Sequence, residues 1–225
     1  LGINTDAVCS IMKADGTILA RKFIDFTSDK DRMIHAMNRT RRKQSKHGPK
    51  SARGLWAYVK RLNEDRAKKI SAAIVEFASQ HSVDAIVMEH LDFKGCRKRG
   101  SKAQRLSMWN HGIIREKVKQ KAHLLGIRIA TICAWKTSAL AFDGSGSVTR
   151  EDNNHALAMF TTGKRYNCDL SASYNIGARY FIRELLKSLP ATEESRVKAK
   201  VPDVGRRTSC TLSTLRVFVK ELSAA

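Results

Sequence analysis

A short apolar run, Ala85-Ile86-Val87-Met88, ends at Glu89 and constrains the fold more than any other segment of the sequence. Helical periodicity precedes it over residues 28–78 and follows it over about 107–125. A continuous apolar run of this length between two helical segments is typical of a parallel strand that is buried on both faces. The run therefore predicts the centre of an α/β fold.

The elements on either side extend this prediction. Residues 1–12 and 18–26 are rich in apolar and β-branched side chains and flank the turn Ala14-Asp15-Gly16-Thr17, which indicates a hairpin. A further strand is expected over 128–135 and a last helix over 171–188. The order hairpin, helices, strand, helix, strand, helix predicts a mixed sheet flanked by helices.

The remaining segments suggest the domain organisation. The helical segment over about 28–80 is strongly basic and is broken at His47-Gly48-Pro49, so we expect an inserted helical hairpin there. A Gly-, Ser- and Asn-rich loop is expected over about 140–168. We expect one domain over 1–187 and a basic C-terminal tail over 188–225, with a short helix near 212–222. Because the sequence starts inside an apparent strand and without Met, we expect an N-terminal region to be missing.

The charge of the chain favours one class of partner. Its 42 Lys and Arg outnumber 21 Asp and Glu, which gives a net charge of +21. Such an excess opposes compaction, so it usually serves to bind a polyanion, and nucleic acid is the leading candidate. An anionic membrane surface is the alternative, but no apolar run approaches the roughly 20 residues that span a bilayer.

The five cysteines are scattered and include no C-x-x-C pair. We therefore expect neither a disulfide framework nor a zinc site, and a reducing, cytoplasmic compartment fits.

Basic residues are concentrated in three segments that contain few acids. One surrounds the helix break, one lies on the following helix, and one follows Glu89. The candidate nucleic-acid-binding residues are Arg41, Arg42, Lys43, Lys60, Arg61, Arg66, Lys94, Arg97, Lys98 and Arg99. A solvated charged face is the alternative interpretation.

A few polar residues stand where such a fold places chemistry. Asn4 and Asp6 are two apart in the expected first strand, so both can point to one face. Glu89 ends the central strand, and Asp169 immediately precedes the last helix. Carboxylates from separate elements can hold two divalent cations that clamp a phosphodiester, and hard oxygen ligands favour Mg²⁺ or Mn²⁺. Each residue also has a structural explanation; Asp169, for example, would serve as a helix N-cap.

The amino-acid sequences of three segments resemble motifs of one protein family. Leu-Gly-Ile-Asn at 1–4, Ile-Val-Met-Glu-His-Leu at 86–91 and Asp-Leu-Ser-Ala-Ser-Tyr-Asn-Ile at 169–176 resemble, in order, the three RuvC motifs of the TnpB (OrfB) family. These transposon-encoded RNA-guided endonucleases are related to type V CRISPR effectors. The resemblance covers about residues 1–187.

The resemblance implies an RNase H-like (RuvC) fold, two-metal cleavage of DNA with Mg²⁺ or Mn²⁺, and a bound guide RNA. Carried over by position, the catalytic residues are Asn4, Glu89 and Asp169, and the metal ligands are Glu89 and Asp169. The family has Asp where this chain has Asn4, and a neutral amide bridges cations poorly; Asp6 is the candidate substitute. The family's zinc ribbon also lacks its cysteines here. The alternatives are a nuclease-dead RNA-guided DNA-binding module and a stand-alone resolvase-like nuclease without guide RNA.

Overall fold

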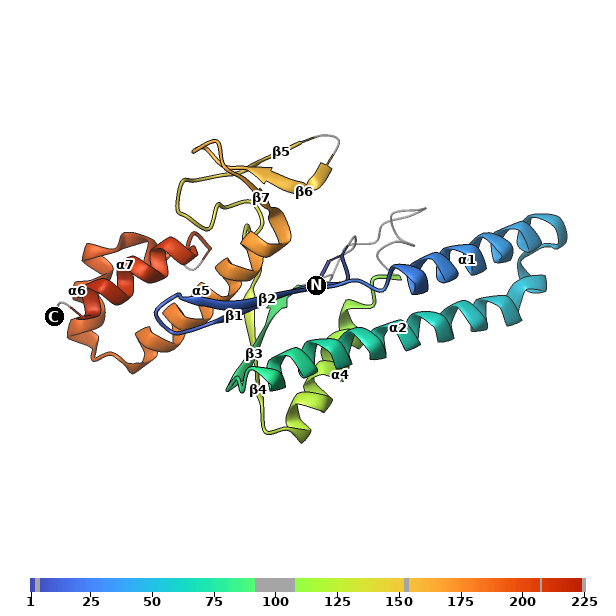
Figure 1. Cartoon of the computed structure of the whole chain (residues 1–225), viewed down its shortest axis with the longest axis horizontal. Helices are drawn as coiled ribbons and strands as arrows, with labels where there is room; N and C mark the ends of the chain where they lie inside the picture. Colours follow the sequence, from blue (N-terminus) through green and yellow to red (C-terminus); the bar gives the residue numbers. More distant parts are fainter. Residues whose placement is uncertain (3–4, 92–107, 152–153, 207, 224–225) are drawn as a thin grey trace. The chain divides into compact units, whose positions relative to one another are not determined.

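The computed structural model describes residues 1–2, 5–91, 108–151, 154–206 and 208–223. The chain is a mixed α/β protein in which groups of strands and groups of helices follow one another along the sequence (Figure 1). It divides into two compact units. The first comprises Leu1–Ala7, Phe23–Ser82 and Lys94–Ile127, and the second comprises Val8–Lys22, Val83–Phe93 and Arg128–Ala225.

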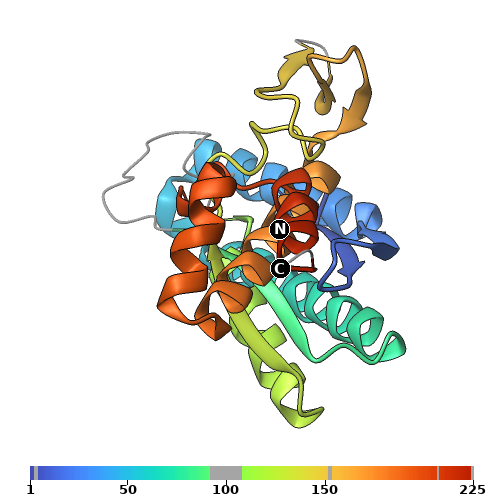
Figure 2. The same ribbon diagram turned by 90° about the vertical axis from the view of Figure 1, so that its left-hand side faces the viewer.

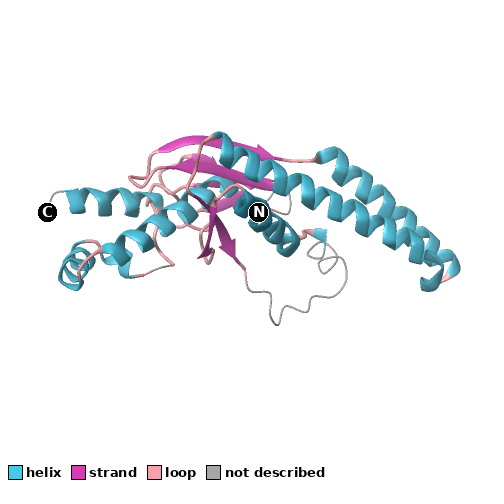
Figure 3. Cartoon of the chain, turned by 90° about the horizontal axis from the view of Figure 1, so that it is seen from below, coloured by secondary structure: helices cyan, strands magenta, loops and turns pink. Residues whose placement is uncertain are grey.

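The first unit is built from helices. Its helical elements are α1 (Thr27–His47), η1 (Pro49–Ala52), α2 (Arg53–Gln80) and α4 (His111–Leu124). Helices α1 and α2 form a long hairpin, which Figures 1 and 3 show side by side, and α2 also packs against α4. The break expected at 47–49 is confirmed: Gly48 has a φ of +79°, and Pro49 starts the short 3-10 turn.

The packing of α2 and α4 follows from their periodicity. On α2, Val59, Ile70 and Ile74 are buried at helical spacing, and Ile114 and Val118 are buried on α4. Helix α4 ends at Leu124, and Gly126 follows with a φ of +69° and an N–H that donates to the His123 carbonyl. A glycine in this left-handed conformation is a common helix stop.

The second unit contains most of the strands. Strands β1 (Ala7–Met12) and β2 (Ile18–Ile24) form the expected hairpin, although β1 starts after Asp6 and not before Asn4. Strands β3 (Ala85–His90) and β4 (Arg128–Cys133) pair in parallel, so the predicted parallel pairing is confirmed. The prediction of a fully buried central strand is not, because β3 and β4 form a two-stranded sheet and Met88 is the one buried residue of β3.

The strands differ from the prediction in their grouping. Among the described residues they pair as three small sheets, β1-β2, β3-β4 and β5-β6-β7, and not as one mixed sheet. The segment expected as a loop contains the antiparallel strands β5 (Thr149–Glu151), β6 (Asn154–Met159) and β7 (Arg165–Asn167). Strands as short as these, separated by Gly- and Asn-rich turns, carry too little alternation to be recognised from sequence.

The C-terminal helices complete the core of the second unit. Helix α5 (Cys168–Ser188) packs against β3, β4 and α7 (Leu212–Ser223), and α5 and α7 lie side by side in Figures 1 and 2. Between them the chain forms α6 (Ala191–Lys200) and η2 (Pro202–Gly205). Leu212, Leu215 and Phe218 are fully buried in this core. The segment expected as a basic tail is therefore folded, because α7 brings a strongly apolar face to α5.

Candidate functional site

Glu89 lies at the end of β3, where the prediction placed it. Its register partner on β4 is Ile132, and one further pair, His90 with Cys133, completes the ladder. The side chain of Glu89 is partly buried. Ligands of open α/β sheets bind at this carboxyl edge of parallel strands, so the position is suited to a functional carboxylate.

Asp169 lies inside α5 and does not cap it. The N-cap is Asn167, whose Oδ1 accepts a hydrogen bond of 2.9 Å from the Leu170 N–H. The structural interpretation of Asp169 as the cap is therefore wrong. The partial positive charge at a helix N-terminus favours a carboxylate in this first turn. Because Asn167 caps the helix, the side-chain oxygens of Asp169 are not needed as the cap.

Hydrogen bonds along α5 fix its direction relative to β4. Arg183 donates to the Thr131 carbonyl (3.0 Å), Arg179 to the carbonyls of Cys133 and Trp135 (2.9 Å each), and Asn175 to that of Thr137 (3.0 Å). The acceptors come later in the sequence as the donors come earlier in α5. Helix α5 is therefore antiparallel to β4 and the segment that follows it. The N-terminal end of α5, which carries Asp169, consequently lies towards the carboxyl end of β4, the end at which the parallel β3 carries Glu89.

Two residues of α5 that anchor this helix by hydrogen bonds were not predicted from the sequence. The amide of Asn175, which is fully buried, donates to the carbonyls of Thr137 and Leu140 and accepts from the Leu212 N–H. The guanidinium of Arg179 donates to four carbonyls, one at the end of β4, one just after it and two before α7. These are the carbonyls of Cys133, Trp135, Thr208 and Cys210. An Asn and an Arg four apart, among the apolar residues of this helix, were the available signal.

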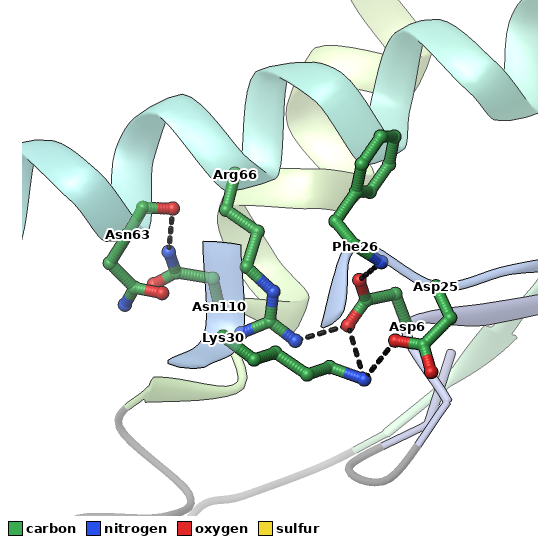
Figure 4. A network of polar contacts seen from close by, with 7 residues as sticks. All are labelled: Asp6, Asp25, Phe26, Lys30, Asn63, Arg66 and Asn110. Atoms are coloured by element: carbon green, nitrogen blue, oxygen red, sulfur yellow. Dashed lines mark hydrogen bonds and ion pairs between the residues drawn. The ribbon is translucent and has the colours of Figure 1, made fainter. Parts of the chain in front are cut away.

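Asp6, in the first unit, is the centre of a buried ionic network (Figure 4). Its Oδ1 accepts a hydrogen bond from Arg66 on α2 and lies 3.3 Å from Nζ of Lys30 on α1. Its Oδ2 accepts 2.9 Å from the Phe26 N–H. The side chain of Asp6 has no exposed surface, and that of Arg66 is 10% exposed. The network ties residue 6 to α1, α2 and the end of β2.

This network decides what Asp6 and Arg66 can do. Burial favours the neutral acid, but the hydrogen bonds from Arg66 and Phe26 and the charges of Arg66 and Lys30 outweigh it and lower the pKa of Asp6. A carboxylate with both oxygens engaged and two cations beside it attracts no further cation. Asp6 is therefore a poor substitute for a metal ligand, and Arg66, which is 10% exposed and bonded to Asp6, offers little surface to a phosphate.

Of the remaining basic candidates, those on α1 and α2 are described by the structure and those that follow Glu89 are not. Arg41, Arg42 and Lys43 are exposed on α1, and Lys60 and Arg61 are exposed on α2. Lys60 lies 3.9 Å from Glu64, a contact that at such exposure holds the lysine only weakly. Asn4 and the third basic group lie outside the described residues; that group comprises Lys94, Arg97, Lys98 and Arg99.

The donors do not add up to a metal centre. Among the residues that the structure describes, no three His, Cys, Asp or Glu side chains gather closely enough to hold a metal ion. Two divalent cations need several bridging carboxylates. Because Arg66 and Lys30 already engage the Asp6 carboxylate, Glu89 and Asp169 are the described candidate ligands that remain. The described residues therefore do not by themselves fit a Mg²⁺ or Mn²⁺ pair. Over the same residues, no helix is both long and apolar enough to cross a membrane.

Comparison with known proteins identifies the fold. No family model matches the sequence, and no curated protein matches it. Among solved structures, the chain is similar to one in the cryo-EM structure of a Cas12f1–sgRNA–target DNA complex, with a TM-score of 0.57 and 18% sequence identity. The match covers 78% of this chain and 47% of that one, so this chain spans about half the length of the chain it matches. The fold is therefore similar to that of about half of the matched chain from the Cas12f1 complex.

Proposed function

We propose that this chain is the nucleic-acid-binding, RuvC-like nuclease domain of an RNA-guided DNA endonuclease of the TnpB kind, with DNA and a guide RNA as its partners and the cytoplasm as its location. The observation that carries this proposal is the fold similarity to Cas12f1, a protein solved in complex with sgRNA and target DNA. The net charge of +21 independently favours a polyanionic partner.

The basic faces of α1 and α2 are the surfaces that we assign to the nucleic acid. Arg41, Arg42 and Arg61 are exposed there, and guanidinium groups bind phosphates in a bidentate manner. Such contacts position a strand or duplex without reading its sequence. In an RNA-guided protein the sequence is read by base pairing, so this division of labour suits the proposal.

Glu89 and Asp169 are the residues that we assign to DNA cleavage. The support for this assignment is the direction of α5, which runs against β4, so that the end of α5 with Asp169 lies towards the carboxyl ends of the paired strands, where β3 carries Glu89. A nuclease-dead DNA-binding module is the second candidate. The engagement of the Asp6 carboxylate by Arg66, Lys30 and the Phe26 N–H favours it, because Asp6 is then not free to replace the carboxylate missing at position 4.

A binding and cleavage experiment separates these candidates. The chain is incubated with end-labelled DNA in Mn²⁺, with and without RNA from its native locus, beside the variants Glu89→Gln, Asp169→Asn and Asn4→Asp. Glu193→Gln on α6, which removes one exposed acid of the same unit, is the control.

Each result points to one candidate. Cleavage by the wild-type chain that Glu89→Gln and Asp169→Asn abolish, and Glu193→Gln retains, supports the nuclease. Cleavage only by Asn4→Asp supports a binding module that has lost one acid. If the wild-type chain binds neither DNA nor RNA, both candidates fail.

A further inference from the structure

A small cavity in the second unit combines aromatic rings with cationic side chains. It has a volume of about 220 Å³ and is lined by Phe142, Tyr166 and Tyr174, by Arg21 and Arg216, and by aliphatic side chains of β2 and α7. None of the described residues that line it is acidic. The cavity lies below the range of roughly 300–1,000 Å³ that is usual for drug-sized ligands, so a ligand that fits it is small.

The aromatic residues form a packed cluster. The ring centroids of Phe142 lie 4.9 Å from Tyr166 and 5.3 Å from Tyr174, at steep angles to both. The hydroxyls of Tyr166 and Tyr174 are 3.1 Å apart. Burial, together with this hydroxyl contact, raises the pKa of Tyr174 to about 12, so the phenol stays neutral near pH 7. The cavity therefore offers flat apolar surface together with neutral hydrogen-bonding groups.

The cations are held in place around this cluster. Arg21 donates to the Tyr166 hydroxyl at 3.4 Å, and Arg216 donates to the Gly16 carbonyl at 3.2 Å. Both arginines are exposed. Lys164 lies over two rings, with its Nζ 4.8 Å from the centroid of Phe142 and 5.2 Å from that of Tyr166. An ammonium in this position marks ring faces that attract cations and planar groups, and a stacking ligand would displace it towards solvent.

We propose that this cavity binds one unpaired nucleotide of a nucleic acid strand, with its base against the Phe142 and Tyr166 rings and its phosphate at the Arg21 and Arg216 guanidinium groups. Bases stack on aromatic side chains whatever their identity, and arginines bind the phosphates beside them. The size admits a single base, and the absence of acids among its described lining residues suits an anion. The inference rests on the proposed function, since it names a subsite for the same nucleic acid.

The test measures binding of short oligothymidylate and oligouridylate strands, and of the same strands with abasic sites, to the 225-residue chain. The double variant Arg21→Ala/Arg216→Ala is compared with Lys13→Ala/Lys220→Ala, which removes the same charge from exposed positions of the same unit outside the cavity. We expect the cavity variant to bind about tenfold more weakly than its control. We also expect the preference of the wild-type chain for base-bearing over abasic strands to disappear in Tyr166→Leu.

A second variant protects the test against misfolding. Leu19 is 54% exposed at the cavity, so Leu19→Glu leaves the core intact and places a carboxylate where the phosphate would approach. It should weaken binding as the double variant does. If the wild-type chain binds and the cavity variants bind like the control, the proposal that the cavity binds a nucleotide is contradicted, while the proposed function stands. If the wild-type chain binds no strand, the proposed function fails and the cavity proposal fails with it. A larger effect on the uridylate or on the thymidylate strand identifies RNA or DNA as the occupant.

Discussion

The guanidinium of Arg66 on α2 donates a hydrogen bond to the buried carboxylate of Asp6, sixty residues earlier in the chain. Breaking a buried ion pair from one side leaves the partner charge without compensation and costs about 3–5 kcal/mol. We therefore expect Asp6→Asn to lower the free energy of unfolding by about that amount, measured by urea denaturation.

Asp25 provides the control for this change. It also contacts Lys30, but its side chain is 41% exposed, and an exposed ion pair contributes about 0–1 kcal/mol. Asp25→Asn should therefore leave stability nearly unchanged. Equal losses in the two variants would contradict a central role for the Asp6 network.

The same pair predicts a pH dependence. Because the folded state lowers the pKa of Asp6, its stabilisation is complete above the unfolded value of about 3.9 and is lost as pH falls through the folded value. The difference in unfolding free energy between the wild-type chain and Asp6→Asn should be constant from pH 7 to about 5 and shrink below about 4. Denaturation series at several pH values measure it. A difference that grows on acidification would have the wrong sign.

Gly16 offers a test of how the β1-β2 turn is packed against α7. Its φ is +84°, and a Cβ there would lie 3.1 Å from both Arg216 and Leu212. Gly163 has a similar φ of +78° with open space around it. Both Gly→Ala changes meet the backbone penalty of about 1–2 kcal/mol, but only Gly16→Ala adds a tight contact, which the side chains of Arg216 and Leu212 must yield to accommodate. We expect Gly16→Ala to lower the melting temperature clearly more than Gly163→Ala. Equal shifts would show that the turn does not press on α7.

Asn175 and Asn167 allow the same substitution to be compared in two settings. Asn167 uses its side-chain oxygen to cap α5, and Asp is an equally good cap, so Asn167→Asp should be nearly neutral. The Asn175 amide donates to two carbonyls, and Asn175→Asp would turn a carboxylate towards them in the core. Leaving buried groups unsatisfied costs about 1–3 kcal/mol each, so we expect a loss of several kcal/mol in calorimetry. Similar melting temperatures would contradict the hydrogen bonds assigned to Asn175.

These sites show which features the sequence pattern predicts and which it does not. The parallel pairing of β3 with β4 and the break at Gly48 follow from local patterns, an apolar run and a Gly-Pro pair, and both predictions are confirmed. The charge of the Asp6 carboxylate is compensated by Arg66, which lies sixty residues away in the sequence. No local sequence pattern predicts such a contact. The structural interpretation of Asp169 as an N-cap depends on a helix that starts at about residue 171; α5 starts at Cys168, so Asn167 is the cap, and sequence patterns do not fix a helix boundary to within such a distance.

The basic faces of α1 and α2 predict a salt-dependent binding that can be traced to single residues. Each phosphate contact releases counterions, and removing one such contact reduces the slope of log K against log salt by about 1. Arg42 on α1 and Arg61 on α2 are exposed, so Arg42→Ala/Arg61→Ala should reduce the slope by about 2 and weaken binding alike for all strand sequences.

The control for this slope removes two lysines that are already paired with acids. Lys187 contacts Glu184 and Lys198 contacts Glu194, so Lys187→Ala/Lys198→Ala changes the net charge equally while removing cations that are partly neutralised. Fluorescence anisotropy across a series of salt concentrations gives both slopes. If the two double variants lower the slope equally, the binding reflects total charge, and the faces of α1 and α2 hold no particular phosphate. A smaller slope for the α1–α2 variant alone assigns phosphate contacts to these helices.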